Sequence, residues 1–360
     1  MHAEDPARRG LTGPVPRRDF LAGALATAVG SAVLPGAARA ASGAAKFPFP
    51  AGREFTALIT GDAGTGKPEQ YAVAAAARRT AAEHGVSLAV GLGDNLYLDG
   101  PESADDDEFQ TKFEQPNAGI DVPWLMILGN HDTSGAVPGS GAGPERGDYE
   151  VAYHDASARW YMPARYYSVA VPEANPVVEF FALDTNPVAS FLPQRDPHYA
   201  WDGPYMREQR AWLDDRLGAS RARWKIVIAH HPYLNNGPYG NAGEYNGITV
   251  DDYASGKHLK ELYEQIVVGR ADLIMSGHDH CSQILAPSGG TQQIVCGASA
   301  QTEDGQSKVT NESFWQDFSH RGFMTLRVSD AGLTLRAYLV DSADPATATG
   351  RLAYTHEIPA

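Results

Sequence analysis

Residues Phe55–Asp62 have the sequence FTALITGD, a short apolar run that ends in glycine and aspartate. An apolar run of this length, bounded by glycine, is typical of a strand buried in a sheet that is covered on both faces. Runs of the same kind recur at Ser87–Leu92, Trp124–Leu128, Val177–Leu183, Trp224–Ala229 and Asp272–Met275. The repetition predicts that the core of the protein is built on buried strands.

Helical patterns separate these runs. The segment Pro68–His84 is rich in alanine, begins with proline and is followed by glycine, which favours a helix over that range. Pro204–Leu217 and Lys257–Val268 carry apolar residues at helical spacing, and glycine follows each of them. Alternation of strands and helices predicts an α/β fold. Short strand-like runs from Cys281 onward predict a β-rich end, and we expect residues 41–360 to form one catalytic domain.

Residues of a few polar types recur directly after the apolar runs. Five runs end in aspartate, asparagine, histidine or tyrosine: Gly61-Asp62, Gly93-Asp94-Asn95-Leu96-Tyr97, Gly129-Asn130-His131-Asp132, His230-His231 and Gly277-His278-Asp279-His280. In open α/β sheets functional groups gather at the carboxyl ends of the strands, and glycine allows the sharp turn that brings the next side chain to the rim. We therefore expect these side chains to converge.

The residue types indicate a transition-metal site. Carboxylate, imidazole, phenolate and amide oxygen ligands suit iron, manganese or zinc, and one carboxylate can bridge two ions. Two ions about 3.5–4 Å apart can bind a phosphoryl group and activate water. The net charge of −15 argues against a general nucleic-acid binder, because such a protein needs clustered Lys and Arg to contact phosphates.

The set of motifs resembles a known family. The chain resembles the purple acid phosphatases, which are calcineurin-like metallophosphoesterases and carry five motifs. The similar segments here are, in order, Gly61-Asp62-x-Gly64, Gly93-Asp94-x-x-Tyr97, Gly129-Asn130-His131-Asp132, Val227-x-x-His230 and Gly277-His278-x-His280. The resemblance covers about Phe55 to Cys281 and is closer to the small, tartrate-resistant type. It implies a four-layer αββα sandwich, in which helices flank two mixed β-sheets.

The resemblance also implies a role for each residue. Asp62, Tyr97 and His280 would bind a first metal, typically Fe(III), and Asp94 would bridge both metals. Asn130, His230 and His278 would complete a second site for Fe(II), Zn or Mn. His131 would act as a catalytic residue that contacts the phosphate or protonates the leaving group.

The function implied is that of an acid phosphatase, which hydrolyses small phosphomonoesters by attack of a metal-activated hydroxide. Two alternatives stay open: a phosphodiesterase on the same binuclear scaffold, and a non-catalytic metal- or phosphate-binding surface protein. The segment Gly61–Lys67 is nearly a P-loop, but Pro68 stands where that motif needs Ser or Thr for Mg²⁺, so a P-loop NTPase is disfavoured.

One position differs from the family pattern, and at another the choice of the metal ligand needs an argument. Many family members carry a further histidine about nine residues after the ligand of the fourth motif, whereas this chain has Tyr239 there. That difference leaves the acid for the leaving group open. His231 directly follows His230, and because neighbours on a strand point to opposite faces, we expect only His230 to be a ligand.

The first forty residues have the pattern of an export signal. Arginines precede the apolar run Phe20–Leu34, which is shorter than the ~20 residues of a membrane span, and Ala38-Arg39-Ala40 is a cleavage pattern. Arg17-Arg18 before that run is typical of a twin-arginine signal, with a general secretory signal as the alternative. We expect a periplasmic or extracellular protein with no membrane span after residue 40.

Cys281 and Cys296 flank a predicted hairpin whose turn contains Ser288-Gly289. A turn centred between those two residues would make the cysteines direct cross-strand neighbours. Export permits a disulfide, but cross-strand geometry can strain one, so a disulfide and two buried thiols are both open.

Overall fold

The computed structural model describes residues 46–190, 193–248, 255–303 and 310–360. The predicted export signal, residues 1–40, lies outside the described residues. All of these described residues belong to one compact unit. Within the described ranges, no helix is both long and apolar enough to cross a bilayer.

The first sheet has seven strands and is mixed. Its order is β14 (Arg351–Pro359), β13 (Gly332–Val340), β12 (Arg321–Ser329), β1 (Phe55–Thr60), β2 (Val86–Gly91), β3 (Trp124–Met126) and β4 (Trp160–Tyr161). Strands β1 to β4 are parallel to one another, and β12 to β14 run antiparallel to their neighbours. The carboxyl ends of β1, β2 and β3 therefore share one edge of this sheet.

The second sheet also has seven strands and is mixed. Its order is β11 (Ser313–Asp317), β9 (Ser282–Ser288), β10 (Thr291–Cys296), β8 (Leu273–Ser276), β7 (Trp224–Ile228), β6 (Val178–Ala182) and β5 (Tyr167–Val171). Strands β6, β7, β8 and β10 are parallel, so the carboxyl ends of β7 and β8 also share one edge.

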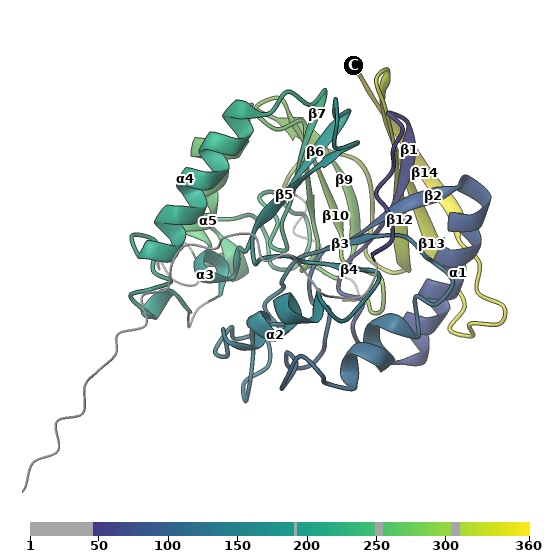
Figure 1. Ribbon diagram of the computed structural model, residues 1–360, viewed down its shortest axis with the longest axis horizontal. Coiled ribbons are helices and arrows are strands. Elements are labelled where there is room, and N and C mark those ends of the chain that lie inside the picture. Colours follow the sequence, from purple (N-terminus) through teal and green to yellow (C-terminus); the bar gives the residue numbers. More distant parts are fainter. Residues whose placement is uncertain (1–45, 191–192, 249–254, 304–309) are drawn as a thin grey trace, which may run out of the picture. The chain divides into compact units, whose positions relative to one another are not determined.

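Helices cover the outer faces of both sheets (Figure 1). Helix α1 (Pro68–His84) packs on β1, β12 and β13, while α3 (Asn186–Ala189), α4 (Pro204–Ala219) and α5 (Lys257–Leu262) lie with the second sheet. One apolar core fills the space between the sheets and another joins the second sheet to its helices. Helix α2 (Arg146–Tyr153) lies below β4 in the view of Figure 1. The expected αββα sandwich is confirmed.

The bounds of the helices and strands agree closely with those predicted from the sequence where a proline, a glycine or an apolar run marks them. Helix α1 has the predicted bounds because Pro68 begins it and Gly85 ends it in the left-handed conformation, with φ of 60°. The six predicted core strands are found within one or two residues of their expected ends. The predicted helix Lys257–Val268 is split, since α5 ends at Leu262 and a π-helical segment, Tyr263–Val267, continues it.

The predicted pairing of the two cysteines is wrong by one residue. Cys296 on β10 pairs with Ser282 on β9, so Cys281 is not its direct partner. The turn is centred between Gly289 and Gly290, one residue later than expected, and a register shift between Thr291 and Gln293 then makes Ser282 the partner of Cys296. Both thiols are free and buried, with the sulfur of Cys281 accepting a hydrogen bond from Gln283 and that of Cys296 lying near the carbonyl of Ile59.

Candidate metal centre

The sequence-predicted residues converge where the carboxyl ends of five strands from both sheets meet. Asp62 follows β1, Asp94 and Tyr97 follow β2, and Asn130 and His131 follow β3. From the second sheet, His230 follows β7, and His278 and His280 follow β8. The amide of His278 donates a hydrogen bond of 2.9 Å to Asp62, across 216 positions of sequence.

The backbone turns unusually sharply at this edge. Asp62, Asp94 and His278 have φ of 56°, 51° and 72°, in the left-handed region that non-glycine residues rarely occupy. Such conformations cluster at functional sites, where the surrounding structure holds them in place. Gly93 is required for packing, because a Cβ there would lie 2.7 Å from both the amide of Gly129 and Nδ1 of His230.

One group of donors surrounds the hydroxyl of Tyr97. That oxygen lies 3.1 Å from Oδ1 of Asp62, 2.8 Å from Oδ2 of Asp94 and 3.0 Å from Nε2 of His280. Tyr97 and both carboxylates are buried. Two carboxylates, a phenol and an imidazole in such proximity form a donor set of the kind that suits a transition-metal ion.

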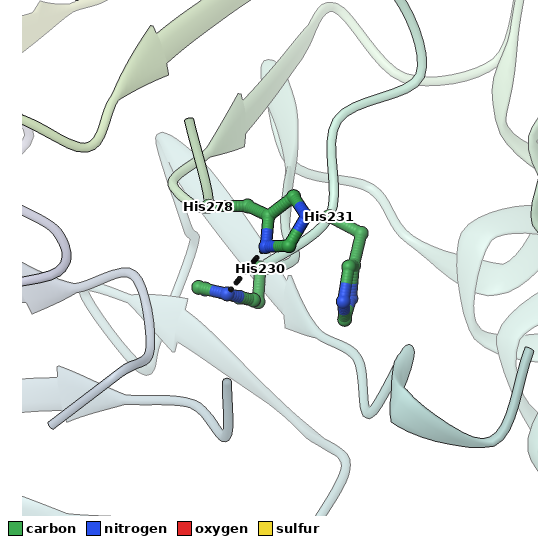
Figure 2. Close-up of side chains that lie close together, drawn as sticks. All are labelled: His230, His231 and His278. Atoms are coloured by element: carbon green, nitrogen blue, oxygen red, sulfur yellow. Dashed lines mark hydrogen bonds between the residues drawn. The ribbon is translucent and has the colours of Figure 1, made fainter. Parts of the chain in front are cut away.

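A second group of donors surrounds the amide of Asn130. Its Oδ1 lies 3.0 Å from Nε2 of His230 and 3.0 Å from Nδ1 of His278, and the two imidazole nitrogens are 3.3 Å apart. The side-chain nitrogen of Asn130 donates to the carbonyl of Gly139 at 3.1 Å, which leaves Oδ1 directed to the histidines. Figure 2 shows His230 and His278 with the nitrogens facing each other.

Asp94 connects the two groups. Its Oδ2 accepts the hydrogen bond from Tyr97, while its Oδ1 lies 3.5 Å from Nε2 of His230 and accepts the amide of His131 at 2.9 Å. Within the described ranges, no lysine or arginine pairs with Asp94 or Asp62. Buried carboxylates without a cation are costly, and burial together with the charge of Asp94 raises the pKa of Asp62. Metal ions between the two groups would remove that cost, so the donors fit a binuclear site.

Neighbouring acceptors direct the histidines toward the centre. Nδ1 of His230 lies 2.8 Å from the carbonyl of Leu92, so Nε2 is the nitrogen left for a metal. Nδ1 of His280 lies 3.5 Å from Glu303, which accepts a 3.1 Å hydrogen bond from Tyr239. Burial lowers the pKa of His280 to about 4, which keeps the ring neutral and available as a ligand at neutral pH. Glu303 could not be predicted from the sequence, because no motif residue lies near it in the chain.

Asp132 holds the two loops of the first sheet together. Its carboxylate accepts the amides of Asn95 at 2.7 Å, Leu96 at 3.0 Å and Gly129 at 2.7 Å. Burial raises its pKa to about 7, and the neighbouring Glu150 is also fully buried. Asp132 belongs to a motif that the sequence analysis identified, but its supporting role follows only from these contacts.

A cavity of about 330 Å³ opens beside the second group of donors. Its wall includes Asn130, His131, His231, Tyr239, Tyr245 and His278. Nδ1 of His131 lies 2.6 Å from the carbonyl of Leu98, and the ring packs on Tyr97 with centroids 4.4 Å apart. With Nδ1 held there, Nε2 of His131 is the nitrogen available to a molecule in the cavity.

The expectation that strand alternation turns His231 away from His230 is wrong. A ring nitrogen of His231 lies within 4.8 Å of ring nitrogens of His230 and His278, and Figure 2 shows the three rings together. Strand β7 ends at Ile228, so the alternation of a strand no longer applies at these positions.

Comparison with protein families agrees with this geometry. The model for the calcineurin-like phosphoesterases matches residues 55–282, which span every donor described above. The chain belongs to the calcineurin-like phosphoesterase family. It is therefore an enzyme of the phosphoesterase kind, and the motifs noted in the sequence lie in the part that the family model covers.

The related sequences are acid phosphatases. The chain is 28% identical over 293 residues to purple acid phosphatase 4 of Arabidopsis thaliana, a match that covers 78% of this chain and 79% of the relative. It is 29% identical over 287 residues to the tartrate-resistant acid phosphatase type 5 of Sus scrofa, covering 74% of this chain and 75% of the relative. These acid phosphatases are homologues of the chain.

Solved structures show the same fold. The GAP50 anchor of the inner membrane complex of Plasmodium superposes with a TM-score of 0.65 at 18% identity, over 86% of this chain and 89% of that one. A dimetal phosphatase from Danio rerio superposes with a TM-score of 0.52 at 13% identity, over 85% and 98% of the two chains.

Asp94→Asn tests the bridging position. Because Asp94 contacts both groups of donors, losing its charge is expected to reduce the metal content of the purified protein from two ions to fewer than one per chain. Elemental analysis of metal-replete protein measures this. The exposed Asp202→Asn removes the same charge away from the centre and should keep two ions; retention of two ions in Asp94→Asn would contradict the shared-ligand geometry.

Proposed function

We propose that the protein hydrolyses phosphomonoesters at a binuclear metal centre. The observation that carries the proposal is the meeting of two donor groups at Asp94, which touches Tyr97 on one side and His230 on the other. The acid phosphatases among its homologues support the same activity.

Two sets of side chains would bind the two metal ions, and one carboxylate would contact both ions. Asp62, Tyr97 and His280 would hold the first ion, Asn130, His230 and His278 the second, and Asp94 both. When bound, the ions would supply positive charge that polarises the phosphoryl group and lowers the pKa of water for its attack on phosphorus. This explains how a chain with a net charge of −15 can bind a phosphate.

His131 is proposed as the group that contacts the leaving oxygen. Its Nδ1 faces the carbonyl of Leu98 at 2.6 Å, which fixes the ring and leaves Nε2 for the substrate. A positioned proton donor contributes about 10²–10⁴-fold to such reactions. Tyr239 is a poorer candidate for this role, because its hydroxyl donates to Glu303.

We propose Fe(III) for the site that contains Tyr97, with Fe(II), Zn or Mn in the second site. The phenol of Tyr97 lies among two carboxylates and an imidazole, and such oxygen-rich sets favour a hard, highly charged ion. In this proposal the phenolate would give the protein a visible charge-transfer colour.

Tyr97→Phe tests the iron assignment. The purified parent is expected to be purple, and the variant is expected to lose the visible absorption band because it lacks the phenolate oxygen. The absorption spectrum and elemental analysis of both proteins measure this. A colourless parent that contains only zinc would contradict the assignment of iron.

The choice between monoester and diester hydrolysis is tested by comparing 4-nitrophenyl phosphate with bis(4-nitrophenyl) phosphate. We expect kcat/KM to be at least about tenfold higher for the monoester, because the second aryl group competes for the same cavity beside the metals. Asp94→Asn measured in parallel corrects for contaminating phosphatase. Preference for the diester would favour the phosphodiesterase alternative, and no turnover by a metal-replete sample would favour a non-catalytic binding protein.

We also propose that residues 1–40 direct export by the twin-arginine route. The proposal rests on the Arg17-Arg18 pair before the apolar run and the Ala38-Arg39-Ala40 pattern after it. Export would place the mature protein in the periplasm or outside the cell.

Conservative substitution of the arginine pair tests the route. We expect Arg17→Lys/Arg18→Lys to leave the full-length chain inside the cell, because the pair is the feature that the route recognises. Cell fractionation and the mass of the exported chain measure this. Arg8→Lys/Arg9→Lys makes the same change outside the motif and should be exported; normal export of the first variant would point to a general secretory signal.

A further inference from the structure

His231 is a buried residue on the cavity wall that the proposed ligand set does not use. Only 2% of its surface is exposed, and it lines the cavity together with Asn130, His131 and His278. Its ring lies 4.6 Å from the ring of His278, measured between centroids. A polar ring in this position is expensive to bury unless its nitrogens are used.

The hydroxyl of Thr185 determines which nitrogen of His231 carries the proton. Its oxygen lies 2.8 Å from Nδ1 of His231 and accepts the backbone amide of the same residue at 3.4 Å. The hydroxyl oxygen already accepts the amide of His231, and among the described residues its own proton has no hydrogen-bond acceptor other than Nδ1, so we assign Thr185 as the donor to Nδ1. Nε2 of His231 then carries the proton of the ring.

The surrounding structure fixes this arrangement firmly. The side chain of Gln209 on α4 accepts the amide of Asp184 at 2.9 Å and donates to its carbonyl at 3.0 Å, which holds the segment that ends in Thr185. From the other side, the hydroxyl of Tyr263 donates to the carbonyl of His231 at 2.9 Å. Hydrogen bonds thus hold the backbone of His231 and Nδ1 of its ring, whereas Nε2 has no hydrogen bond to another described residue.

Two other polar side chains of the same wall, those of Tyr239 and Asn130, already donate within the protein. The hydroxyl of Tyr239 donates to Glu303 at 3.1 Å, while its ring packs against His278 with centroids 4.6 Å apart. The side-chain nitrogen of Asn130 donates to Gly139. Next to the second donor group, the N–H of His231 is therefore available to an anion in the cavity.

We propose that Nε2 of His231 donates a hydrogen bond to a phosphoryl oxygen of the bound substrate. His231 would be a substrate-contacting residue beside the metal ligand His230, on the wall where Tyr239 cannot donate. This inference rests on the proposed function, because it concerns the same site. A hydrogen bond to a charged oxygen in a buried site changes affinity by about 10- to 100-fold.

A pair of substitutions isolates the donor at Nε2. His231→Asn places an amide near the position of Nδ1 and keeps a partner for Thr185, but has no group at the position of Nε2. His231→Gln extends an amide N–H to about the position of Nε2. Binding of inorganic phosphate to the metal-loaded proteins, measured by calorimetry, is expected to weaken about 10- to 100-fold in His231→Asn and to recover largely in His231→Gln.

Elemental analysis accompanies the binding measurement. The proposal expects both variants to keep two metal ions per chain. Unchanged phosphate affinity in His231→Asn would overturn it, and so would loss of one ion, because His231 would then be a metal ligand. If the parent binds phosphate as described but hydrolyses no phosphoester, the proposed function fails while the contact of His231 stands.

The proton position gives a readout that does not depend on activity. In ¹⁵N spectra of the histidine-labelled, zinc-loaded protein, we expect Nδ1 of His231 to be unprotonated and Nε2 to be protonated. Thr185→Val removes the hydroxyl donor and should weaken phosphate binding, and Thr185→Ser, which keeps the hydroxyl, should recover most of that loss. A proton on Nδ1 in the parent protein would overturn the proposal.

Discussion

The structure depends on the burial of two carboxylates, Asp62 and Asp94, between the ends of two sheets. Both side chains are almost completely inaccessible, and burial, together with repulsion from Asp94, raises the pKa of Asp62. Removing such charges from water costs several kcal/mol per ion unless a counter-charge replaces the lost solvation. Without a bound cation, burial keeps the phenol of Tyr97 and the imidazoles of His230, His278 and His280 in their neutral forms, so none of them supplies that counter-charge.

The sheet topology makes this concentration of polar groups possible. Parallel strands place their carboxyl ends at a common edge, and the two sheets bring two such edges together. Close packing of the loops then requires residues without side chains, as at Gly93, and left-handed backbone at Asp62, Asp94 and His278. Asp132 offsets part of this strain by accepting three backbone amides from the two loops of the first sheet.

The donors that hold the ions are distinct from the groups that would recognise the substrate. Ligand nitrogens are directed inward by acceptors behind them, as the carbonyl of Leu92 does for His230. The cavity side carries His131 and His231, each with Nδ1 bound to the protein and Nε2 available. The direction of the hydrogen bond behind the ring differs: a carbonyl accepts from Nδ1 of His230 and leaves a free lone pair on Nε2 for a metal, whereas the hydroxyl of Thr185 donates to Nδ1 of His231 and leaves a proton on Nε2.

Local patterns in the sequence determined the strands, the first helix and the identity of the donor residues. Apolar runs, a proline at a helix start and glycines at strand ends act within a few residues, so no tertiary contact is needed to recognise them. Tertiary structure alone decided the rest. The distances between the donors around Tyr97 and Asn130, the support from Glu303 and the place of His231 all depend on contacts between distant segments. The shifted partner of Cys296 depends on the position of a hairpin turn that the sequence pattern placed one residue too early. A pattern of residues along one strand does not contain that information, because the energy of each contact depends on what the other sheet places opposite it.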